Sequence, residues 1–484
     1  MAKRVARNSS AVVIGNLSVR VVSVLVAILL ARYLLVSEYG DYGFVVAYVA
    51  LFAVVAQLGL EAVLTREISK DKAKASLYVG NAISLSAVMS LVAIAASVIV
   101  SWVVWPGGRF VGYTFVASFM LLSGSLGSVC SSILSAELRM EYDAIAKVAD
   151  RTVSALLIVW IIYSHGALLQ VLMATTASNL CSFLVVLASS RKFVRFRPRY
   201  DRGTMKYLLS QSWPLALSSE LIVIYMRTDK VMLELMKGSE AVGLYTVVFR
   251  LTEALGILAT ALMISFFPLL SYQYPRSETA HRRLYRLAFK YATSLIVPIA
   301  TAGTFLAKPA IIALFGAKYA PSAPILQILV WAEVFIFIGI VNNRILISVN
   351  KQKLDLIFTG LSALGNVVLN LMLIPRHSYV GAAAATLVAS ATGPIAGFFL
   401  VSTRDYSASA FRSLARPAAA SCLVAAFLIF VPVGLWLSVA AVVPIYLVSL
   451  YALRGISGED VRFMRDVLGI GRAAREPREE VRMP

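Results

Sequence analysis

Fourteen apolar runs, each long enough to cross a lipid bilayer as a helix, follow one another along this 484-residue chain. A hydrocarbon core of about 30 Å takes about 20 helical residues, and a backbone inside it must satisfy its hydrogen bonds within its own helix. The predicted spans are 10–35, 41–64, 77–105, 111–135, 147–164, 167–188, 209–236, 241–273, 287–316, 322–349, 354–375, 380–402, 414–432 and 434–454. Since only 14% of the residues are charged and 59% are hydrophobic, the sequence predicts an all-α integral membrane protein.

The lysine and arginine residues of the loops and termini lie almost entirely on one predicted side of the membrane. Thirty-two of them fall in the termini and loops of one side, and only Arg109, Lys237, Lys318 and Arg376 fall on the other. Cytoplasmic loops carry this excess, so both termini are predicted to be cytoplasmic. The net charge of +20 is therefore interpreted as a topology signal and not as a nucleic-acid-binding surface. The first apolar run is too long for a signal peptide, so we expect it to be retained.

The longest connection between predicted spans divides the chain into two parts. Residues 37–42 (SEYGDY) and 239–245 (SEAVGLY) share a Ser-Glu pair followed by Gly-x-Tyr at matching positions of the two parts, and internal repeats are a common plan in transporters. The predicted organisation is a six-helix lobe (1–188), a basic cytoplasmic linker (189–208), a second six-helix lobe (209–402), an extra helix pair (403–454) and a cytoplasmic tail (455–484).

Ionisable residues recur inside the predicted spans, where they are costly and usually mark the path of a substrate or ion. At about 100° per residue they fall into polar stripes on four helices. The stripes hold Glu220, Arg227, Lys230 and Glu234 on 209–236; Arg250 and Glu253 on 241–273; Asn16, Arg20 and Ser23 on 10–35; and Glu333 and Arg344 on 322–349. Such stripes predict a charged cavity between the two lobes.

Two of these groups also have a purely structural interpretation. Arg250 and Glu253 are one turn apart and form either a buried ion pair that locks their helix or part of a transport site. Arg227 and Lys230 share their stripe with two glutamates, so a sign-balanced network within one helix is an alternative to a transport role.

Three further charged residues are interpreted separately. Arg20 has no acidic residue on its own helix, which favours a ligand contact. Asp229 lies nearly opposite the stripe of its helix and is predicted to brace neighbouring helices. Arg151 lies near the start of a predicted span, where snorkelling to the interface is the default explanation.

The sequence predicts neither a metal site nor a cofactor, and it disfavours an enzyme. Cys130, Cys181 and Cys422 lie far apart within predicted spans, and no cluster has metal-ligand spacing. The loops on the predicted outer side are all short, which leaves no room for a soluble catalytic domain. A membrane enzyme of polysaccharide assembly remains an alternative from another functional class.

Two segments of the chain resemble a known family. Residues 224–233 (IYMRTDKVML) with 242–245 (VGLY), and residues 31–34 (ARYL) with 38–42 (EYGDY), are similar to the polysaccharide transport (Wzx-type flippase) family of the multidrug/oligosaccharidyl-lipid/polysaccharide (MOP) superfamily. The resemblance implies the MOP or MATE-like fold: two six-helix lobes plus a helix pair, in the bacterial inner (cytoplasmic) membrane.

The resemblance also implies a function, and the charged stripes fit it. Such a flippase moves a polyprenyl-pyrophosphate-linked oligosaccharide, the repeat unit of O-antigen, capsule or exopolysaccharide, from the cytoplasmic to the outer leaflet. Arginines pair well with phosphates. The implied partners are this glycan lipid, membrane lipids and polysaccharide polymerase or assembly proteins, with no nucleic acid. The predicted pyrophosphate contacts are Arg20, Arg227, Lys230, Arg250 and Arg344, with Asn16 and Ser23 as polar cavity residues.

Transport by alternating access is predicted, with rocking of the two lobes. Glu220, Glu253 and Glu333 are the candidates for coupling to a proton or sodium ion. A lipid II flippase and a multidrug or cation antiporter of the same superfamily are the alternative functions within this fold.

Overall fold

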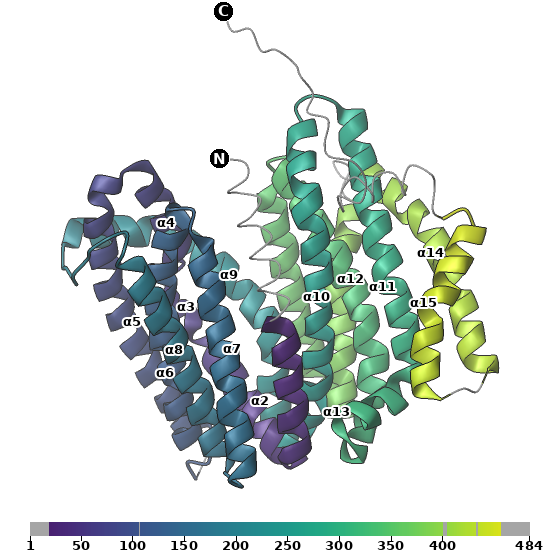
Figure 1. Ribbon diagram of the computed structural model, residues 1–484, viewed down its shortest axis with the longest axis horizontal. Coiled ribbons are helices and arrows are strands. Elements are labelled where there is room, and N and C mark those ends of the chain that lie inside the picture. The colour runs from purple at the N-terminus through teal and green to yellow at the C-terminus, as the bar shows by residue number, and fades with distance from the viewer. Residues whose placement is uncertain (1–18, 106, 400–403, 432–433, 456–484) are drawn as a thin grey trace, which may run out of the picture. The chain divides into compact units, whose positions relative to one another are not determined.

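The computed structural model describes the backbone of residues 19–105, 107–399, 404–431 and 434–455, and in these ranges the chain is helical with no strand (Figure 1). The predicted all-α class is confirmed. A first helix covers residues 19–33. The elements that follow are α2 (Val36–Leu51), α3 (Ala53–Gln57), α4 (Leu60–Lys70), η1 (Lys72–Lys74), α5 (Ala75–Val104), α6 (Val111–Ala136), α7 (Met140–Tyr163), α8 (Leu168–Ser190), α9 (Arg202–Lys237), α10 (Ser239–Gln273), α11 (Glu278–Phe315), η2 (Ala317–Ser322), α12 (Ala323–Ser348), α13 (Gln352–Phe399), α14 (Arg404–Phe430) and α15 (Leu435–Ala452).

Eight helices of the described chain are long and apolar enough to cross a membrane, or nine if the bent pair Val36–Leu51 and Ala53–Lys70 counts as one span. The predicted count of fourteen is therefore approximate. Part of the difference lies in α13, where the backbone leaves helical geometry at Ser378 (φ 51°, ψ −134°) and two helices meet. The two spans predicted at 354–375 and 380–402 fall on either side of that residue.

The second predicted span is broken rather than straight. Its two parts, Val36–Leu51 and Ala53–Lys70, meet at 41° at Phe52. Within the second part the backbone at Leu58 (φ 53°) and Gly59 (φ 65°) is left-handed. A side chain at Gly59 would bring a Cβ to within 2.6 Å of the Ala216 nitrogen. Glycine is thus required both by the dihedral angle and by the close approach of α9. The apolar pattern of 41–64 does not reveal this bend.

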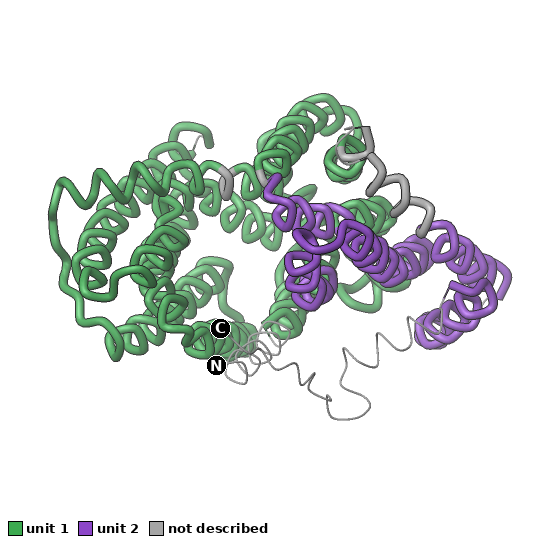
Figure 2. The backbone as a smooth tube through the Cα atoms, turned by 90° about the horizontal axis from the view of Figure 1, so that it is seen from above, with its two compact units in different colours: residues 1–257, 307–336, 352–396 green, residues 258–306, 337–351, 397–484 purple. Residues whose placement is uncertain are grey.

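The helices form two compact units (Figure 2). The first unit contains residues 1–257, 307–336 and 352–396, and the second contains residues 258–306, 337–351 and 397–484. The described residues of the predicted first lobe all belong to the first unit.

Small residues line the helix contacts inside the first unit. Helix α6 packs against α5 and α8. Helix α5 buries several serines, and α6 buries several serines and Thr114. The Thr114 hydroxyl donates to Ser101 Oγ (3.3 Å) across this contact. Small side chains let helix backbones approach closely in lipid, where no hydrophobic force drives helices together.

Polar contacts and an apolar core join helices of the second unit. The Tyr285 hydroxyl donates to Asn342 Oδ1 (3.0 Å), which joins α11 to α12. The core cluster of α14 and α15 contains Val424, Tyr446 and Leu450, with Ala302 of α11 packed against it.

The segment 189–208, predicted to be a cytoplasmic linker, is docked onto the start of α5. The Arg199 N–H donates to the Gly80 carbonyl (3.1 Å), and the Asp201 N–H donates to Asn81 Oδ1 (2.6 Å). Asp201 caps α9 by accepting from the Thr204 N–H (2.9 Å). Hydrogen bonds from the Thr204 hydroxyl and backbone hold the pKa of the Asp201 carboxyl below its usual range.

Candidate functional site

An ion-pair cluster forms between α9 and α10 in the first unit. Arg227 Nη2 lies 3.3 Å from Glu253 Oε1, and Arg250 Nη1 lies 3.7 Å from Glu253 Oε2. Arg20, on the first helix, interacts electrostatically with both Arg227 and Glu253. Three arginines from three helices therefore share one carboxylate.

Lys230 is buried beside this cluster. Lys230 is only 2% exposed, and its Nζ lies 4.2 Å from the centroid of the Phe249 ring. Within the described chain Lys230 forms no ion pair, and its interactions with Arg227 and Glu253 are longer-range. Lys230 also interacts at longer range with Asp229. A buried ammonium that no carboxylate contacts directly is unfavourable, so the position is suited to a negatively charged ligand.

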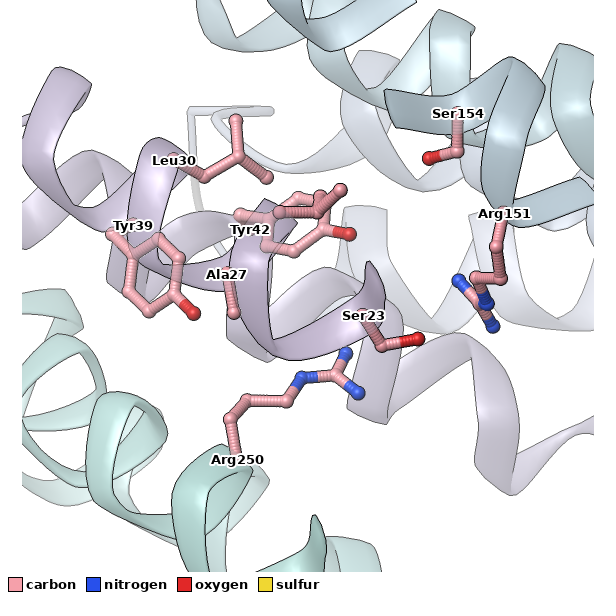
Figure 3. A pocket seen from close by; sticks show the side chains of 9 residues that line it. Ser23, Ala27, Leu30, Tyr39, Tyr42, Arg151, Ser154 and Arg250 are labelled. Carbon is pink, nitrogen blue, oxygen red and sulfur yellow. The ribbon is translucent and has the colours of Figure 1, made fainter. Parts of the chain in front are cut away.

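Arg250 also lines a pocket of the first unit, and this pocket contains a second basic residue (Figure 3). Arg151 and Ser154 reach it from α7, and Ser23 reaches it from the first helix. In Figure 3 the guanidinium groups of Arg151 and Arg250 extend toward the Ser23 hydroxyl from different helices. The Ser23 hydroxyl donates to the Val19 carbonyl (2.7 Å).

Arg151 is the charged pocket residue that the sequence analysis did not place in the site. The predicted span began at residue 147, which put Arg151 close to the membrane boundary. Helix α7 begins at Met140, so Arg151 lies near its middle. The signal was present in the spacing of Arg151 and Ser154, which lie one turn apart on one helix face. Hydropathy obscured it, because the first half of α7 is rich in charged residues.

Asp229 joins three helices through hydrogen bonds. Its Oδ1 accepts from Asn370 Nδ2 (2.6 Å), and its Oδ2 accepts from the Tyr245 hydroxyl (2.6 Å) and the Thr386 hydroxyl (2.8 Å). The residue is 1% exposed. These partners come from α10 and both parts of α13, so Asp229 links these segments to α9.

Replacing Asp229 by alanine should lower the free energy of unfolding by about 3 kcal/mol or more, because several buried donors lose their acceptor. The measurement is thermal or denaturant unfolding of the purified protein in detergent, followed by tryptophan fluorescence. Glu240→Ala is the matched control, since Glu240 is exposed at the start of α10. Equal stability of the two variants would contradict the bracing role.

The two Ser-Glu…Gly-x-Tyr segments lie against each other. A Cβ added at Gly40 would overlap the Ser239 carbonyl, and a Cβ added at Gly243 would overlap the Val36 carbonyl. Gly243 lies four residues after Ser239, whose carbonyl faces Gly40. In the same way Gly40 lies four residues after Val36, whose carbonyl faces Gly243. The starts of α2 and α10 therefore cross in a reciprocal arrangement, which we call the glycine crossing.

A polar network surrounds the glycine crossing. Arg109 Nη2 lies 2.9 Å from each oxygen of Asp41 and donates to Ser239 Oγ (3.0 Å). The Ser239 hydroxyl in turn donates to Glu234 Oε1 (3.0 Å). Glu234 is thus engaged at this end of α9 and does not pair with Arg227.

Among the remaining predicted site residues whose side chains are described, only Glu333 interacts with the ion-pair cluster. Glu333 is 5% exposed and interacts electrostatically with Glu253. Arg344 belongs to the second unit, where its guanidinium carbon lies 5.8 Å from the centroid of the Phe267 ring. Asn16 lies outside the described residues, as does the side chain of Glu220. No group of three or more His, Cys, Asp or Glu residues able to hold a metal ion occurs in the described part of the chain.

Residues 5–273 match the family model described as "Polysaccharide biosynthesis protein", and residues 214–372 match the model described as "MatE". An uncharacterized membrane protein of Methanocaldococcus jannaschii, MJ1068, is 23% identical over 395 residues, which cover 76% of this chain and 78% of that protein.

Two groups of solved structures share the fold. The lipid II flippase MurJ in an inward closed conformation has a TM-score of 0.76 at 14% identity, with 94% of this chain and 99% of that chain covered. An inward-facing multidrug resistance MATE family transporter of the MOP superfamily has a TM-score of 0.63 at 18% identity, with 81% and 95% covered. At these identities the likeness is one of fold.

Proposed function

Because the chain belongs to the polysaccharide biosynthesis protein family and has the fold of MOP superfamily transporters, we propose that it is a flippase for a polyprenyl-pyrophosphate-linked oligosaccharide. The cargo is a repeat unit of O-antigen, capsule or exopolysaccharide, and it moves from the cytoplasmic to the outer leaflet of the cytoplasmic membrane. Both termini are cytoplasmic in this proposal, and the protein acts as a transporter and not as an enzyme.

The excess of positive charge around Glu253 carries the proposal. Four basic residues interact with this carboxylate: Arg20, Arg227, Lys230 and Arg250. Two further acids, Glu333 and Asp229, interact with members of the cluster, so the basic residues are still in excess. A pyrophosphate supplies the negative charge that the cluster lacks, and guanidinium groups bind phosphate oxygens through paired hydrogen bonds. The polyprenyl tail stays in the lipid, so only the head group needs to enter the protein.

Arg32 does not contribute to this charge excess. Its Nε donates to the Leu314 carbonyl (2.8 Å), and its Nη2 donates to the Ala313 carbonyl (2.6 Å). It thereby satisfies free carbonyls at the end of α11. The role of Arg344 as a pyrophosphate contact stays a prediction.

Movement of the head group follows alternating access, and ion coupling resets the cycle. The candidates for coupling remain Glu220, Glu253 and Glu333. Among them Glu253 is already shared by basic residues, while Glu333 is buried and makes no ion pair within the described chain. Glu333 is therefore the preferred candidate of the two whose side chains are described.

The function is tested with purified protein in vesicles that contain a fluorescent polyprenyl-diphosphate-linked sugar in both leaflets. A reductant that does not cross the membrane quenches only the outer-leaflet label in protein-free vesicles. We expect the protein to bring the inner-leaflet label within reach of the reductant. Parallel vesicles with labelled lipid II, and vesicles loaded with a cationic dye, test the two alternative cargoes. A protected inner-leaflet label in every lipid arm would contradict the proposal.

A further inference from the structure

We propose that the pocket between the first helix, α2, α7 and α10 binds a diphosphate, with Arg151 and Arg250 on different walls as its two cationic contacts (Figure 3). The inference deepens the proposed function, because it adds Arg151 and its neighbours to the head-group site. The polar side chains that line the pocket are Ser23, Tyr39, Tyr42, Arg151, Ser154 and Arg250.

The lining of the pocket selects for negative charge. Two guanidinium groups face it, the other polar lining groups are hydroxyls, and none of its lining residues is acidic. Each arginine has one acidic neighbour outside the pocket lining: Asp150 Oδ2 lies 3.6 Å from Arg151 Nε, and Glu253 Oε2 lies 3.7 Å from Arg250 Nη1. A cation entering this space meets like charge, while an anion meets two donors of opposite charge.

Both guanidinium groups retain donors for a ligand. The two ion-pair distances exceed the usual range of an N–H···O hydrogen bond, so neither contact uses up an N–H group. Within the described chain, Arg151 and Arg250 donate no hydrogen bond. Each guanidinium carries five N–H donors in a planar fork that matches two phosphate oxygens.

Hydroxyl groups extend the donor set. Ser154 and Tyr42 are 3% and 8% exposed, and neither hydroxyl has a hydrogen-bond partner in the described structure. In Figure 3 the Tyr42 hydroxyl points toward the side of the pocket formed by Ser154 and Arg151. Ser23 is different, because its hydroxyl already donates to the Val19 carbonyl. The Ser154 and Tyr42 hydroxyl groups therefore stay available as donors to phosphate oxygens.

Two cations on separate walls favour a ligand with two linked phosphates over one with a single phosphate. One phosphate can occupy the fork of Arg250, and the second can occupy that of Arg151. The site recognises the diphosphate itself, which occurs as a lipid head group or as a free anion. The test of Arg151 therefore compares a ligand that carries two phosphates with a ligand that carries one.

The experiment measures the dissociation constants of farnesyl diphosphate, farnesyl monophosphate and inorganic pyrophosphate for the full-length protein in detergent, by calorimetry. We expect the wild type to prefer the diphosphate lipid to the monophosphate, and pyrophosphate to bind more weakly than the diphosphate lipid. Arg151→Gln should weaken diphosphate binding about tenfold to a hundredfold, as expected for lost charge-assisted hydrogen bonds. It should change monophosphate binding little, so the preference disappears. Arg151→Lys should fall between, because it keeps the charge without the fork.

Lys147→Gln is the matched control, since it removes a positive charge one turn earlier on α7, where Lys147 pairs with Asp143 (2.7 Å) outside the pocket. Equal affinity of pyrophosphate and farnesyl diphosphate, both weakened by Arg151→Gln, would support the site with a free diphosphate as its ligand. An unchanged diphosphate preference in a folded Arg151→Gln variant would overturn the inference, as would a wild type that binds none of the three probes. Neither binding result determines the outcome of the vesicle assay, because that assay measures movement of lipid between leaflets and not binding of a diphosphate to this pocket.

Discussion

Arg227→Ala should reduce movement of the polyprenyl-diphosphate-linked sugar between leaflets by about tenfold to a hundredfold, because it removes a charge-assisted contact to the head group. Arg227 is the basic residue closest to the shared carboxylate, at 3.3 Å from Glu253. Arg227→Lys should recover part of the rate, since an ammonium keeps the charge but binds one oxygen at a time. The vesicle assay with the labelled lipid measures both rates.

A double variant separates a ligand contact from a structural ion pair. Removing Arg227 alone leaves Glu253 with only the longer contact to Arg250, at 3.7 Å. If the pair only locks the two helices, Arg227→Gln combined with Glu253→Gln removes both charges together and restores transport. We expect transport to stay low, because the phosphate contact is still missing. Arg202→Ala, at the exposed start of the same helix, is the control for loss of charge. Full transport by both Arg20→Ala and Arg227→Ala would rule out the charged site.

Gly40→Ala and Gly243→Ala should each lower the free energy of unfolding by about 1–3 kcal/mol, the usual effect of overpacking a tight contact. In both cases the new methyl group overlaps a backbone carbonyl of the opposite helix, and a backbone atom cannot move aside as a flexible side chain does. Transport should fall as well, because the glycine crossing cannot form as described. Unfolding of the purified variants, followed by tryptophan fluorescence, measures the effect.

Gly365→Ala is the matched control for the glycine crossing. Gly365 lies within α13, and a Cβ added there has no neighbour within 4 Å. Because alanine favours a helix over glycine by roughly 0.5–1 kcal/mol, this variant should be at least as stable as the wild type. Stability of the Gly40 and Gly243 variants equal to that of Gly365→Ala would show that the crossing is not a tight contact in solution.

Hydrophobic pattern was sufficient to predict the fold class, because each long helix must cover its backbone with apolar residues to lie in lipid. It was not sufficient to predict local geometry. The bend at Phe52 and the left-handed backbone at Leu58 and Gly59 are local features, and a window of average hydropathy does not register them. The helix α7 extends seven residues before its predicted start, at Met140 instead of 147, because hydropathy excludes charged residues that still belong to a helix.

The candidate site was only partly accessible to sequence reasoning. Helical spacing separated Asp229 from the stripe of Arg227, and the structure gives the two residues different partners. Spacing within one helix does not identify partners on other helices, so the pairing of Arg227 with Glu253 was not predicted. Arg151 was missed for the same reason, since its relation to Arg250 exists only after α7 and α10 have packed.

The glycine crossing has the symmetry of an isologous interface, in which the same patch is used twice. Each half of the contact presents one glycine and accepts the other half's glycine against its own carbonyl. Two copies of a chain half as long would make the same contact as a homodimer, with a single glycine satisfying both sides. In the present chain Gly40 and Gly243 are separate residues. The sequences around them can therefore differ, while each of the two positions still requires glycine.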